Sequence, residues 1–480
     1  MENITSKNLS SITVDEYIRQ IEVTHDLLKY EIEGWSAWCI LRFPVQLKLF
    51  HAQSTSEKSI IKNDYRNRWQ RGYSVLRAIA KLITVKQKSY FVKSYTSGLA
   101  EKEGEKYKDI WFDDLLIMIG NYIKVESINN LQFAKRRSTA LVPSNILMDD
   151  FNFIIMQVAK IGFPSYINHV SQNIGTCLEK EFGDLFSTEW VKSELIRFYW
   201  LKRFYTVLLY KVNPQFVLTV DPGEYALVAA AKERSIKVVE FQHGFLDRYH
   251  SAYSWTTYAL NYKQKMPVPD YIFLYGIYWK KELDVYGFWG NSLRSVGSLR
   301  IDSYRHHRTN LNRPSICNLL VTTQGIHTAE LITFMSEFLT LAHDILNLRL
   351  TIKLHPGYDR DKTPYFMAFH TDERVEIIEG PTALSTFELL TMAHIHVSIS
   401  STCHYEAIAL GVPTVILPIA SHEIVLPLYQ VGHAFLVHTP KDLLNLVVNW
   451  QTLKVPQGVD SYYFQLGALE NIKKELMELA

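Results

Sequence analysis

The residues best suited to chemistry stand in one stretch of the chain, from Arg349 to Pro418. Ser400, Ser401 and Thr402 fall where a predicted strand passes into a predicted helix. Their hydroxyls and the unpaired N–H groups of the first helical turn would point together at an anion, which we expect to be a phosphate. Glu406, one turn further along, would accept hydrogen bonds from the vicinal hydroxyls of a sugar. These residues predict a site for the phosphate and ribose of a nucleotide.

A histidine and a proline extend this site from another strand end. His355 and Pro356 follow the apolar, β-branched run from Arg349 to Leu354, and a ring nitrogen of His355 would hydrogen-bond a phosphoryl oxygen. The alternative interpretation is that the hydroxyl residues only cap a helix and that Glu406 is solvated. We favour the functional interpretation because all of these features lie at successive strand ends, where open α/β sheets bind ligands.

The elements that must position these side chains follow from the apolar pattern. Residues 395–399 predict a strand, residues 403–410 a helix ended by glycine, and residues 414–417 a second strand, which together form a βαβ unit. An earlier strand, beginning near residue 316, ends in Gln324 and Gly325. Glycine permits a ligand to approach the backbone closely, so this turn belongs to the same predicted nucleotide site.

A second group of polar residues follows two consecutive predicted strands, 216–220 and 236–241. The first strand leads into Asp221-Pro-Gly-Glu224 and the second into Gln242-His243-Gly244. We expect both groups at one sheet edge, because βαβ crossovers bring the carboxyl ends of parallel strands together. Asp221 or Glu224 would act as a general base, and His243 is a further candidate. The alternative is a turn, a helix cap and a histidine satisfied by backbone.

Length and pattern predict the domain organisation. A chain of 480 residues is long for a single core. We expect an α/β protein with a mainly helical N-terminal segment packed on the first domain, an acceptor-side Rossmann-like domain, a nucleotide-sugar-binding Rossmann-like domain that faces it across a cleft, and a C-terminal helical tail. The predicted boundaries are residues 1–88, 89–300, 301–450 and 451–480.

Composition narrows the functional class. The formal net charge is +2, and without a long Lys/Arg tract we expect no nucleic-acid partner. The four cysteines are scattered without a C-x-x-C pair, which argues against a zinc site and for a reducing compartment. The N-terminus is polar, and no apolar run approaches the ~20 residues of a spanning helix. We therefore expect a soluble, cytoplasmic protein.

The predicted helix at residues 189–211 has a composition that allows two interpretations. Residues 189–211 are rich in aromatic and basic side chains. Aromatic residues at these spacings are typical of packing between domains, which is the interpretation that we favour. The alternative is that this helix lies on a membrane surface, which would place the protein peripherally on the inner membrane.

Taken together, the two halves and the position of the nucleotide signature resemble a GT-B glycosyltransferase. The run from Glu406 to Thr414 looks like the E-A-x-x-x-G-x-P element of that superfamily. The Gln242-His243-Gly244 run, followed by His250 and Tyr253, is similar to a Q-H-G element of capsule-assembly enzymes. The resemblance covers about residues 89–450.

A narrower resemblance concerns bacterial sialyltransferases and the Kdo transferases that build capsule and lipopolysaccharide. Their acidic-x-Gly, His-Pro and Ser/Thr motifs are similar to Asp221-Pro-Gly223, His355-Pro356 and Ser400-Ser401-Thr402. Pro222 stands where sialyltransferases commonly have a second acid, so the choice of base between Asp221 and Glu224 stays open.

The resemblance implies a role for each matched residue. In these families the acidic residue deprotonates the acceptor hydroxyl, while the histidine and the hydroxyl cluster stabilise the departing nucleotide phosphate. Asp221 would be the base, His355 and residues 400–402 the phosphate site, and Glu406 the ribose contact. No metal and no cofactor is implied, because GT-B sites use helix N-termini and side-chain donors for the leaving-group charge.

The sequence therefore predicts an inverting, metal-independent glycosyltransferase of bacterial surface polysaccharide synthesis. Its partners would be a nucleotide-sugar donor, first of all a CMP-activated acidic sugar such as a sialic-acid-like or Kdo residue, and a glycan or lipid-linked glycan acceptor. The alternatives are a CDP-polyol phosphotransferase of the GT-B type, a sugar-nucleotide epimerase or hydrolase, and a non-enzymatic scaffold of a polysaccharide assembly complex. The candidate catalytic residues are Asp221, Glu224, His243 and His355. The candidate donor-nucleotide-binding residues are Gln324, Gly325, His355, Pro356, Ser400, Ser401, Thr402 and Glu406.

Overall fold

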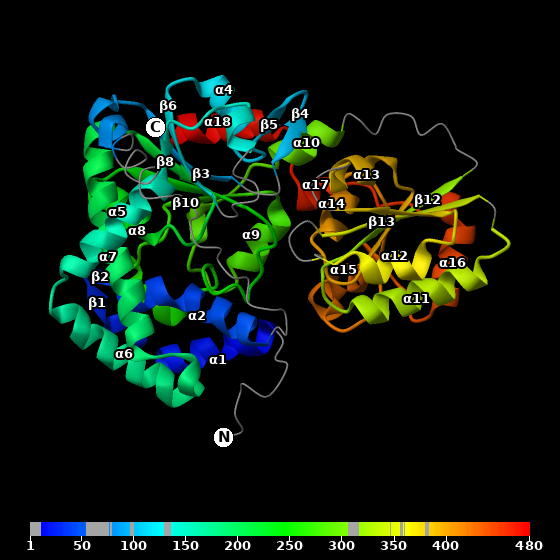
Figure 1. The fold of residues 1–480 in the computed structure, drawn as a ribbon, viewed down its shortest axis with the longest axis horizontal. Coiled ribbons are helices and arrows are strands. Elements are labelled where there is room, and N and C mark those ends of the chain that lie inside the picture. The colour runs from blue at the N-terminus through cyan, green and yellow to red at the C-terminus, as the bar shows by residue number, and fades with distance from the viewer. Residues whose placement is uncertain are drawn as a thin grey trace.

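The computed structural model describes residues 11–53, 76, 79–96, 100–128, 136–305, 316–345, 347–355, 359, 361–379 and 384–480. Pro356 and most of the accessory helical segment predicted at residues 54–88 lie outside this part of the chain. Two α/β domains lie next to each other (Figure 1). Helix α10 (Leu299–Arg305) leads from the first domain towards the second, and α17 (Val459–Tyr463) lies on the way back.

The first domain is built on a parallel sheet of seven described strands in the order β11-β10-β9-β8-β3-β6-β7. Several of its strands are buried throughout, as strands covered on both faces must be. The strands are β3 (Tyr90–Thr96), β6 (Tyr122–Ile128), β7 (Ile146–Leu147), β8 (Phe216–Thr219), β9 (Lys237–Phe241), β10 (Tyr271–Leu274) and β11 (Leu293–Ser295).

Helices cover both faces of this sheet (Figure 1). One face packs against α4 (Asp113–Ile119) and the C-terminal helix α18 (Ala468–Leu479). The other face packs against a larger layer with an apolar core. Its helices are α5 (Met148–Ile161), α6 (Tyr166–Phe182), α7 (Thr188–Val212), α8 (Tyr225–Lys232) and α9 (Ile277–Leu283). A short hairpin, β4 (Glu101–Glu103) and β5 (Lys106–Lys108), lies beside α10.

The second domain repeats this plan on a parallel sheet of six described strands in the order β14-β13-β12-β15-β16-β17. The strands are β12 (Cys317–Thr322), β13 (Leu348–Lys353), β14 (Val375–Ile378), β15 (Ile395–Ser398), β16 (Thr414–Ile416) and β17 (Phe435–Leu436). The helices are α11 (Thr328–Leu341), α12 (Thr363–Phe369), α13 (Thr386–Met392), α14 (Cys403–Ala409), α15 (Leu426–Gln430) and α16 (Pro440–Val448). The predicted βαβ unit is β15-α14-β16.

Each sheet has one topological switch point, where the strand order reverses. In the first sheet the chain starts at β3, continues to β6 and β7, and then returns to β8 on the other side of β3. In the second sheet the corresponding pair is β12 and β15. Ligands of open α/β sheets bind outside the carboxyl ends of the strands at such a point. The polar residues after β8, β12 and β15 therefore stand where the topology favours a site.

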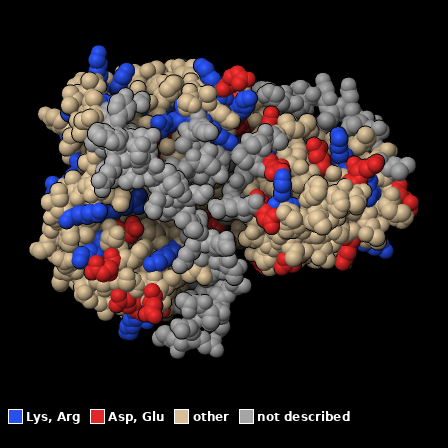
Figure 2. All heavy atoms as spheres, viewed as in Figure 1, with Lys and Arg blue, Asp and Glu red and all other residues tan. Residues whose placement is uncertain are grey.

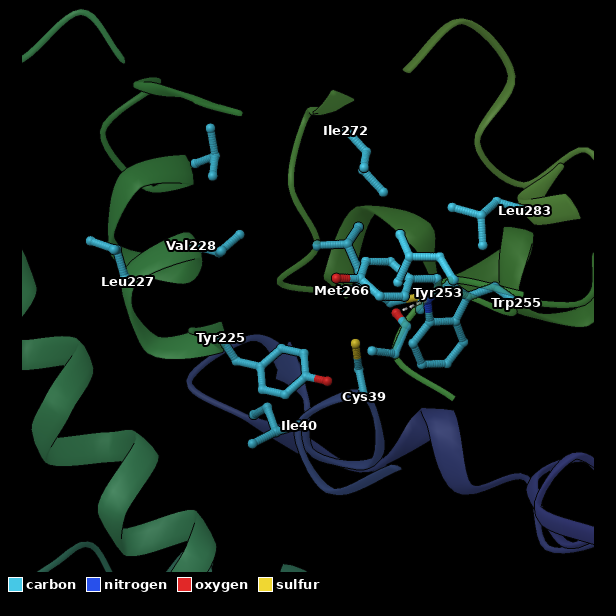
Figure 3. Close-up of a cluster of buried hydrophobic side chains, with 14 of the residues drawn as sticks. Cys39, Ile40, Tyr225, Leu227, Val228, Tyr253, Trp255, Met266, Ile272 and Leu283 are labelled. Atoms are coloured by element: carbon cyan, nitrogen blue, oxygen red, sulfur yellow. Dashed lines mark hydrogen bonds between the residues drawn. The ribbon is translucent and has the colours of Figure 1, made fainter. Parts of the chain in front are cut away.

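The N-terminal segment packs on the first domain. Helices α1 (Ser11–Thr24) and α2 (Ala37–Gln53), with the small strands β1 (Glu31–Ile32) and β2 (Trp35–Ser36) between them, contribute to the core of the larger helical layer. Figure 3 shows Cys39 and Ile40 beside Tyr225 of α8, with Tyr253 and Trp255 on the opposite side of the cluster. The segment thus shares a core with the loop that follows β9.

The aromatic helix predicted at residues 189–211 is α7, but it does not pack between the domains. It lies on the far side of the first domain from the second (Figure 1), where it packs against α6 and α8. The spacing of its aromatic residues, including the buried Phe198 and Tyr205, correctly indicated burial but could not say against what. Acidic and basic side chains are mixed over the visible face of both domains (Figure 2). The described helices include none that is long and apolar enough to cross a membrane.

The end of the chain joins the two domains. The segment with α17 runs beside α9 of the first domain and α14 of the second, and α18 then enters the first domain's core. Two glycines permit this close packing. A Cβ atom on Gly276 would lie 2.5 Å from the carbonyl oxygen of Tyr463, and one on Gly297, where φ is +100°, would lie 2.3 Å from that of Gln465. Side chains at these positions would push the returning chain away.

We predict that Gly276→Ala lowers the free energy of unfolding by about 1–3 kcal/mol, the usual cost of forcing a methyl group into a packed site. Gly162→Ala is the matched control, because Gly162 also has an extended backbone and a Cβ there meets no atom within 4 Å. Urea denaturation followed by circular dichroism measures both. Equal unfolding free energies for the two variants would contradict the tight contact between α9 and the returning chain.

Candidate functional site

At the switch point of the second sheet, hydrogen bonds join the turns that follow the two flanking strands. The backbone N–H and the hydroxyl of Ser400 both donate to Oε1 of Gln324, at 2.9 and 3.1 Å. Gln324 follows β12 and Ser400 follows β15, so one side-chain amide bridges the two strands that flank the switch point. The structure thus brings together two of the residues predicted from sequence, and the bridge fixes the turn that precedes α14.

An aspartate that the sequence reading missed organises the neighbouring loops. Asp359 Oδ2 accepts hydrogen bonds from the Thr323 hydroxyl, from the backbone N–H of Gly325 at 3.0 Å and from that of His355 at 3.3 Å. Gly325 has φ +69°, a left-handed conformation that suits glycine. Asp359 therefore holds the ends of β12 and β13 in register with each other.

Asp359 and Asp361 also form an Asp-x-Asp spacing, a possible metal signature. Asp361 accepts a hydrogen bond from the backbone N–H of Thr363 at 2.9 Å, at the start of α12. Within the described residues there is no group of three or more His, Cys, Asp and Glu side chains that could hold a metal ion. Both aspartates accept hydrogen bonds from backbone N–H groups.

His355 stands at this edge, after β13. Burial lowers the pKa of its imidazole, and the charge of Asp359 opposes that shift. The ring is therefore neutral at neutral pH, with one nitrogen that donates and one that accepts. Such a ring can donate a hydrogen bond to a phosphoryl oxygen, and that His355 does so stays a prediction. The partner residue of the motif, Pro356, lies outside the described residues.

The hydroxyl residues before α14 have different local tasks. Ser401 Oγ accepts a hydrogen bond from the backbone N–H of Cys403, the first residue of α14, at 3.2 Å. The carbonyl oxygen of Thr402 accepts from the N–H groups of Tyr405 at 3.0 Å and Glu406 at 3.3 Å. Ser400 and Ser401 thus have protein partners, while the side chain of Thr402 lines a cavity described below.

In the first domain, the two candidate bases have unlike surroundings. Burial raises the pKa of Glu224, but the Lys93 charge at 3.0 Å and hydrogen bonds from Tyr95 and Tyr205 outweigh it, and the net pKa is lowered. Glu224 is therefore ionised and held by three partners. Among the described residues, the carboxylate of Asp221 accepts a hydrogen bond only from the backbone N–H of Gly223, at 2.6 Å. This difference favours Asp221 over Glu224 as a base.

The turn after β9 places His243 near Asp221. Gln242 fixes this turn by donating to the carbonyl of Gly244 at 2.8 Å and accepting from the N–H of Tyr275 at 2.8 Å. Burial lowers the pKa of His243, while the negative charge of Asp221 acts in the opposite direction. Nδ1 of His243 is buried and has no hydrogen-bond partner among the described residues. A neutral imidazole with one nitrogen to spare can take up or supply a proton.

A cavity of about 130 Å³ lies between the domains. Gln242, His243 and Gly244 line it from the first domain, and Thr402, Tyr405 and Glu406 line it from the second. The structure therefore brings His243 to the same space as Thr402 and Glu406. The other predicted site residues are not among those that line this cavity: Asp221, Glu224, Gln324, Gly325, His355, Ser400 and Ser401.

An arginine that the sequence reading missed completes the cavity. Arg300, on α10, lines it together with Phe387 and stacks its guanidinium 3.8 Å from the centre of that ring. Its Nε donates to Glu101 at 2.6 Å. Burial raises the pKa of Glu406 and the Arg300 charge opposes this shift. Arg300 is thus a fixed positive charge beside Glu406, and its only sequence signal is a basic residue at the predicted boundary between the two domains.

The N-terminal segment anchors the loop that follows His243. Arg42 donates to the carbonyl of Ser251, and Gln46 exchanges two hydrogen bonds with the backbone of this loop, to the carbonyl of Tyr249 at 2.8 Å and from the N–H of Ser251 at 3.0 Å. Arg42 is fully buried and lies 2.9 Å from a carboxylate oxygen of Glu22 and 3.6 Å from one of Asp15. Burial raises the pKa of Asp15 to about 6 despite this charge.

We predict that Arg42→Met destabilises the protein by about 3–5 kcal/mol, because the buried Glu22 loses the cation paired with it and Asp15 keeps only its pairing with Arg19 among the described residues. Arg203→Met is the matched control, since Arg203 is half exposed and its pairing with Glu33 at 2.8 Å is a surface ion pair that contributes less than about 1 kcal/mol. Chemical denaturation at neutral pH measures both. Similar stability of the two variants would show that the buried network does not hold the loop.

Comparisons with known proteins agree on the architecture. No protein-family model matches the sequence, and a search of curated proteins finds no significant match. Among solved structures, UDP-GlcNAc 2-epimerase from Methanocaldococcus jannaschii superposes with a TM-score of 0.52 at 14% identity, over 82% of this chain and 99% of that one. The Neisseria meningitidis enzyme bound to UDP-GlcNAc gives 0.51 at 15% identity, over 81% and 100%. The S. aureus MnaA–UDP complex gives 0.50 at 13% identity, over 82% and 98%.

These neighbours are GT-B fold proteins. The protein has the GT-B fold: two parallel α/β domains that face each other, with a helical addition at the N-terminus. This confirms the fold predicted from the sequence. The narrower resemblance to sialyltransferases and Kdo transferases stays a prediction.

Proposed function

We propose that the protein is an enzyme that binds a nucleotide sugar between its two domains and breaks the bond between the anomeric carbon and the nucleotide phosphate. One observation carries this proposal. The cavity between the domains joins His243, from the end of β9, to Thr402 and Glu406, from the β15–α14 turn. A proton-transfer group and a nucleotide-type turn thus meet at the carboxyl edges of two GT-B sheets.

In this proposal the second domain holds the nucleotide. Glu406 accepts the ribose hydroxyls, and the Thr402 hydroxyl and the neutral His355 donate to the phosphate. Arg300 adds a positive charge at the cavity wall. The cavity of about 130 Å³ is smaller than the ~300–1,000 Å³ of typical ligand pockets. Substrate entry therefore requires the domains to separate, and their closure excludes water from the reacting centre.

The first domain supplies the proton transfer. Asp221 is the less constrained of the two acids after β8, and its charge reaches His243. Asp221 would act as the general base, and His243 as its partner at the cavity wall. No metal is needed in this scheme, because hydrogen-bond donors and Arg300 face the charge that develops on the leaving group.

Two reactions share this bond cleavage. An epimerase or hydrolase turns over the nucleotide sugar without an acceptor, and the similarity to enzymes whose structures contain UDP-GlcNAc or UDP supports this candidate and a UDP-linked substrate. Inverting transfer to a glycan, with a CMP-activated acidic sugar as donor, is supported by the Asp221-Pro-Gly, His-Pro and Ser-Ser-Thr runs. We rank the acceptor-independent reaction first, and transfer second.

We predict that the purified protein converts UDP-GlcNAc without an acceptor, either to free UDP or to an epimeric UDP-sugar, and that Asp221→Asn slows this conversion by about 10²–10⁴-fold, the usual contribution of a general base. Asp344→Asn is the matched control, because the side chain of Asp344 is 89% exposed and lies outside the candidate site. Chromatography of the nucleotide products measures both.

The same assay with CMP-sialic acid, with and without a glycan acceptor, separates the candidates. Release of CMP only when acceptor is present would replace the first candidate by the second. Failure of UDP, CMP and both nucleotide sugars to bind in calorimetry would contradict the proposed function as a whole.

A further inference from the structure

A second and larger cavity lies between the two domains. Its volume is about 590 Å³, within the range of small-molecule sites. It opens among α9 of the first domain, α15 of the second and the returning segment with α17. We call it the tyrosine cavity, and its lining is Tyr278, Glu282, Pro427, Leu428, Val431, His433, Gln457, Gly458, Val459, Tyr462 and Tyr463.

The Tyr405 side chain lies between the tyrosine cavity and the candidate site. Tyr405 lines the smaller cavity, and its ring centre lies 5.6 Å from that of Tyr278 and 5.1 Å from that of Tyr463, which line the larger one. The hydroxyls of Tyr405 and Tyr278 are 3.3 Å apart. Glu406, the proposed ribose contact, is the next residue on the same helix. A ligand in the tyrosine cavity would therefore lie just behind the nucleotide site.

The charges around the tyrosine cavity exclude an anionic ligand. Among the described residues that line it, none is a lysine or an arginine. Its one carboxylate, Glu282, is neutralised from outside by Arg248, whose Nε and Nη2 donate to the two carboxylate oxygens at 3.0 and 2.7 Å. Lys281, which is not a lining residue, has its ammonium group 5.1 Å from the centre of the Tyr462 ring. A phosphate or a carboxylate would thus lose its water without gaining a partner.

The remaining groups suit a neutral, polyhydroxylated molecule. Tyr278 and Tyr462, which are partly exposed, offer flat apolar faces that can cover the C–H faces of a sugar ring, whereas the ring of Tyr463 is buried. The amide of Gln457 and the imidazole of His433, which is 2.8 Å from the hydroxyl of Tyr463, offer donors and acceptors for hydroxyls. A hydrocarbon would leave these polar groups unpaired, which costs free energy.

We propose that the tyrosine cavity binds an uncharged saccharide of one or two sugar units. The proposal deepens the proposed function and rests on it for its purpose: the saccharide would regulate the nucleotide site and would not be a reacting acceptor, because the Tyr405 side chain lies between the two cavities. Tyr405 is then the shared wall through which an occupied saccharide site affects the helix that carries Glu406.

Saturation-transfer NMR tests this with lactose and chitobiose as neutral probes and sialyllactose as the anionic one. We expect a saturation-transfer signal for both neutral sugars. The signal for sialyllactose should be weaker by about tenfold, which corresponds to a binding free energy less favourable by ~1.4 kcal/mol. Val431→Trp places an indole in the mouth of the cavity from a residue that is 58% exposed, and should abolish the signal. Val448→Trp is the matched control, a valine at another helix end that is 63% exposed and remote from the cavity.

The nucleotide site and the saccharide site fail separately in this design. Glu406→Gln should weaken UDP binding and leave the saturation-transfer signal of lactose unchanged. Val431→Trp should abolish the lactose signal and leave UDP binding unchanged. The proposal is overturned if neither neutral sugar binds, if Val431→Trp leaves their signals unchanged, or if sialyllactose binds better than lactose. If the unsubstituted protein binds the neutral saccharides but does not turn over a nucleotide sugar, the result would count against the proposed function alone.

Discussion

The arrangement of the two domains depends on the aromatic packing around Tyr405. This side chain lies among Tyr278 and Trp279 of the first domain and Tyr463 of the returning segment, with ring centres 4.9 to 5.6 Å away. The indole N–H of Trp279 donates to the carbonyl of Tyr463 at 2.8 Å, which fixes the same three-way contact through the backbone. Aromatic pairs at such distances add to the free energy of burial, so this cluster sets how the two sheet edges face each other.

The chemistry is placed by the neighbours of that cluster. Glu406 follows Tyr405 on α14, and the turn of Gln242 and His243 is held against Tyr275, just before Gly276 and α9. Residues that pack the domains together thus alternate along the chain with residues that line the cavity. A change in the angle between the domains would alter the distance between His243 and Glu406 directly, which links domain closure to the proposed bond cleavage.

The fold and the sheet edges could be predicted from the sequence because their signals are local. Apolar runs ending in polar residues identified β8, β9, β12, β13 and β15, and the rule that parallel strands share a carboxyl edge placed Gln324 and Ser400 together, as the structure shows. Local reading also left Asp221 and Glu224 as equal candidates. It could not see that Lys93, Tyr95 and Tyr205, all distant in sequence, hold Glu224.

The features that the sequence analysis missed are long-range contacts without a periodic pattern. Arg42 donates to the backbone of a loop more than two hundred residues away in the sequence. Helix α18 packs in the first domain's core, and its amphipathic pattern predicts a buried face but not the surface that covers it. Asp359 escaped notice because its role is to collect three N–H and O–H donors from separate loops. Arg300 lines the cavity because α10, which carries it, leads from the first domain to the second.

The central claim is that a nucleotide lies between the turn before α14 and the turn after β9. Hydrogen exchange followed by mass spectrometry, with and without UDP-GlcNAc, tests this most directly, because it reports on both turns in one measurement. The account predicts slower exchange of the backbone amides of residues 400–406 and of residues 242–244 when the nucleotide sugar is present. Protection confined to one domain, or found only at other segments, would contradict it.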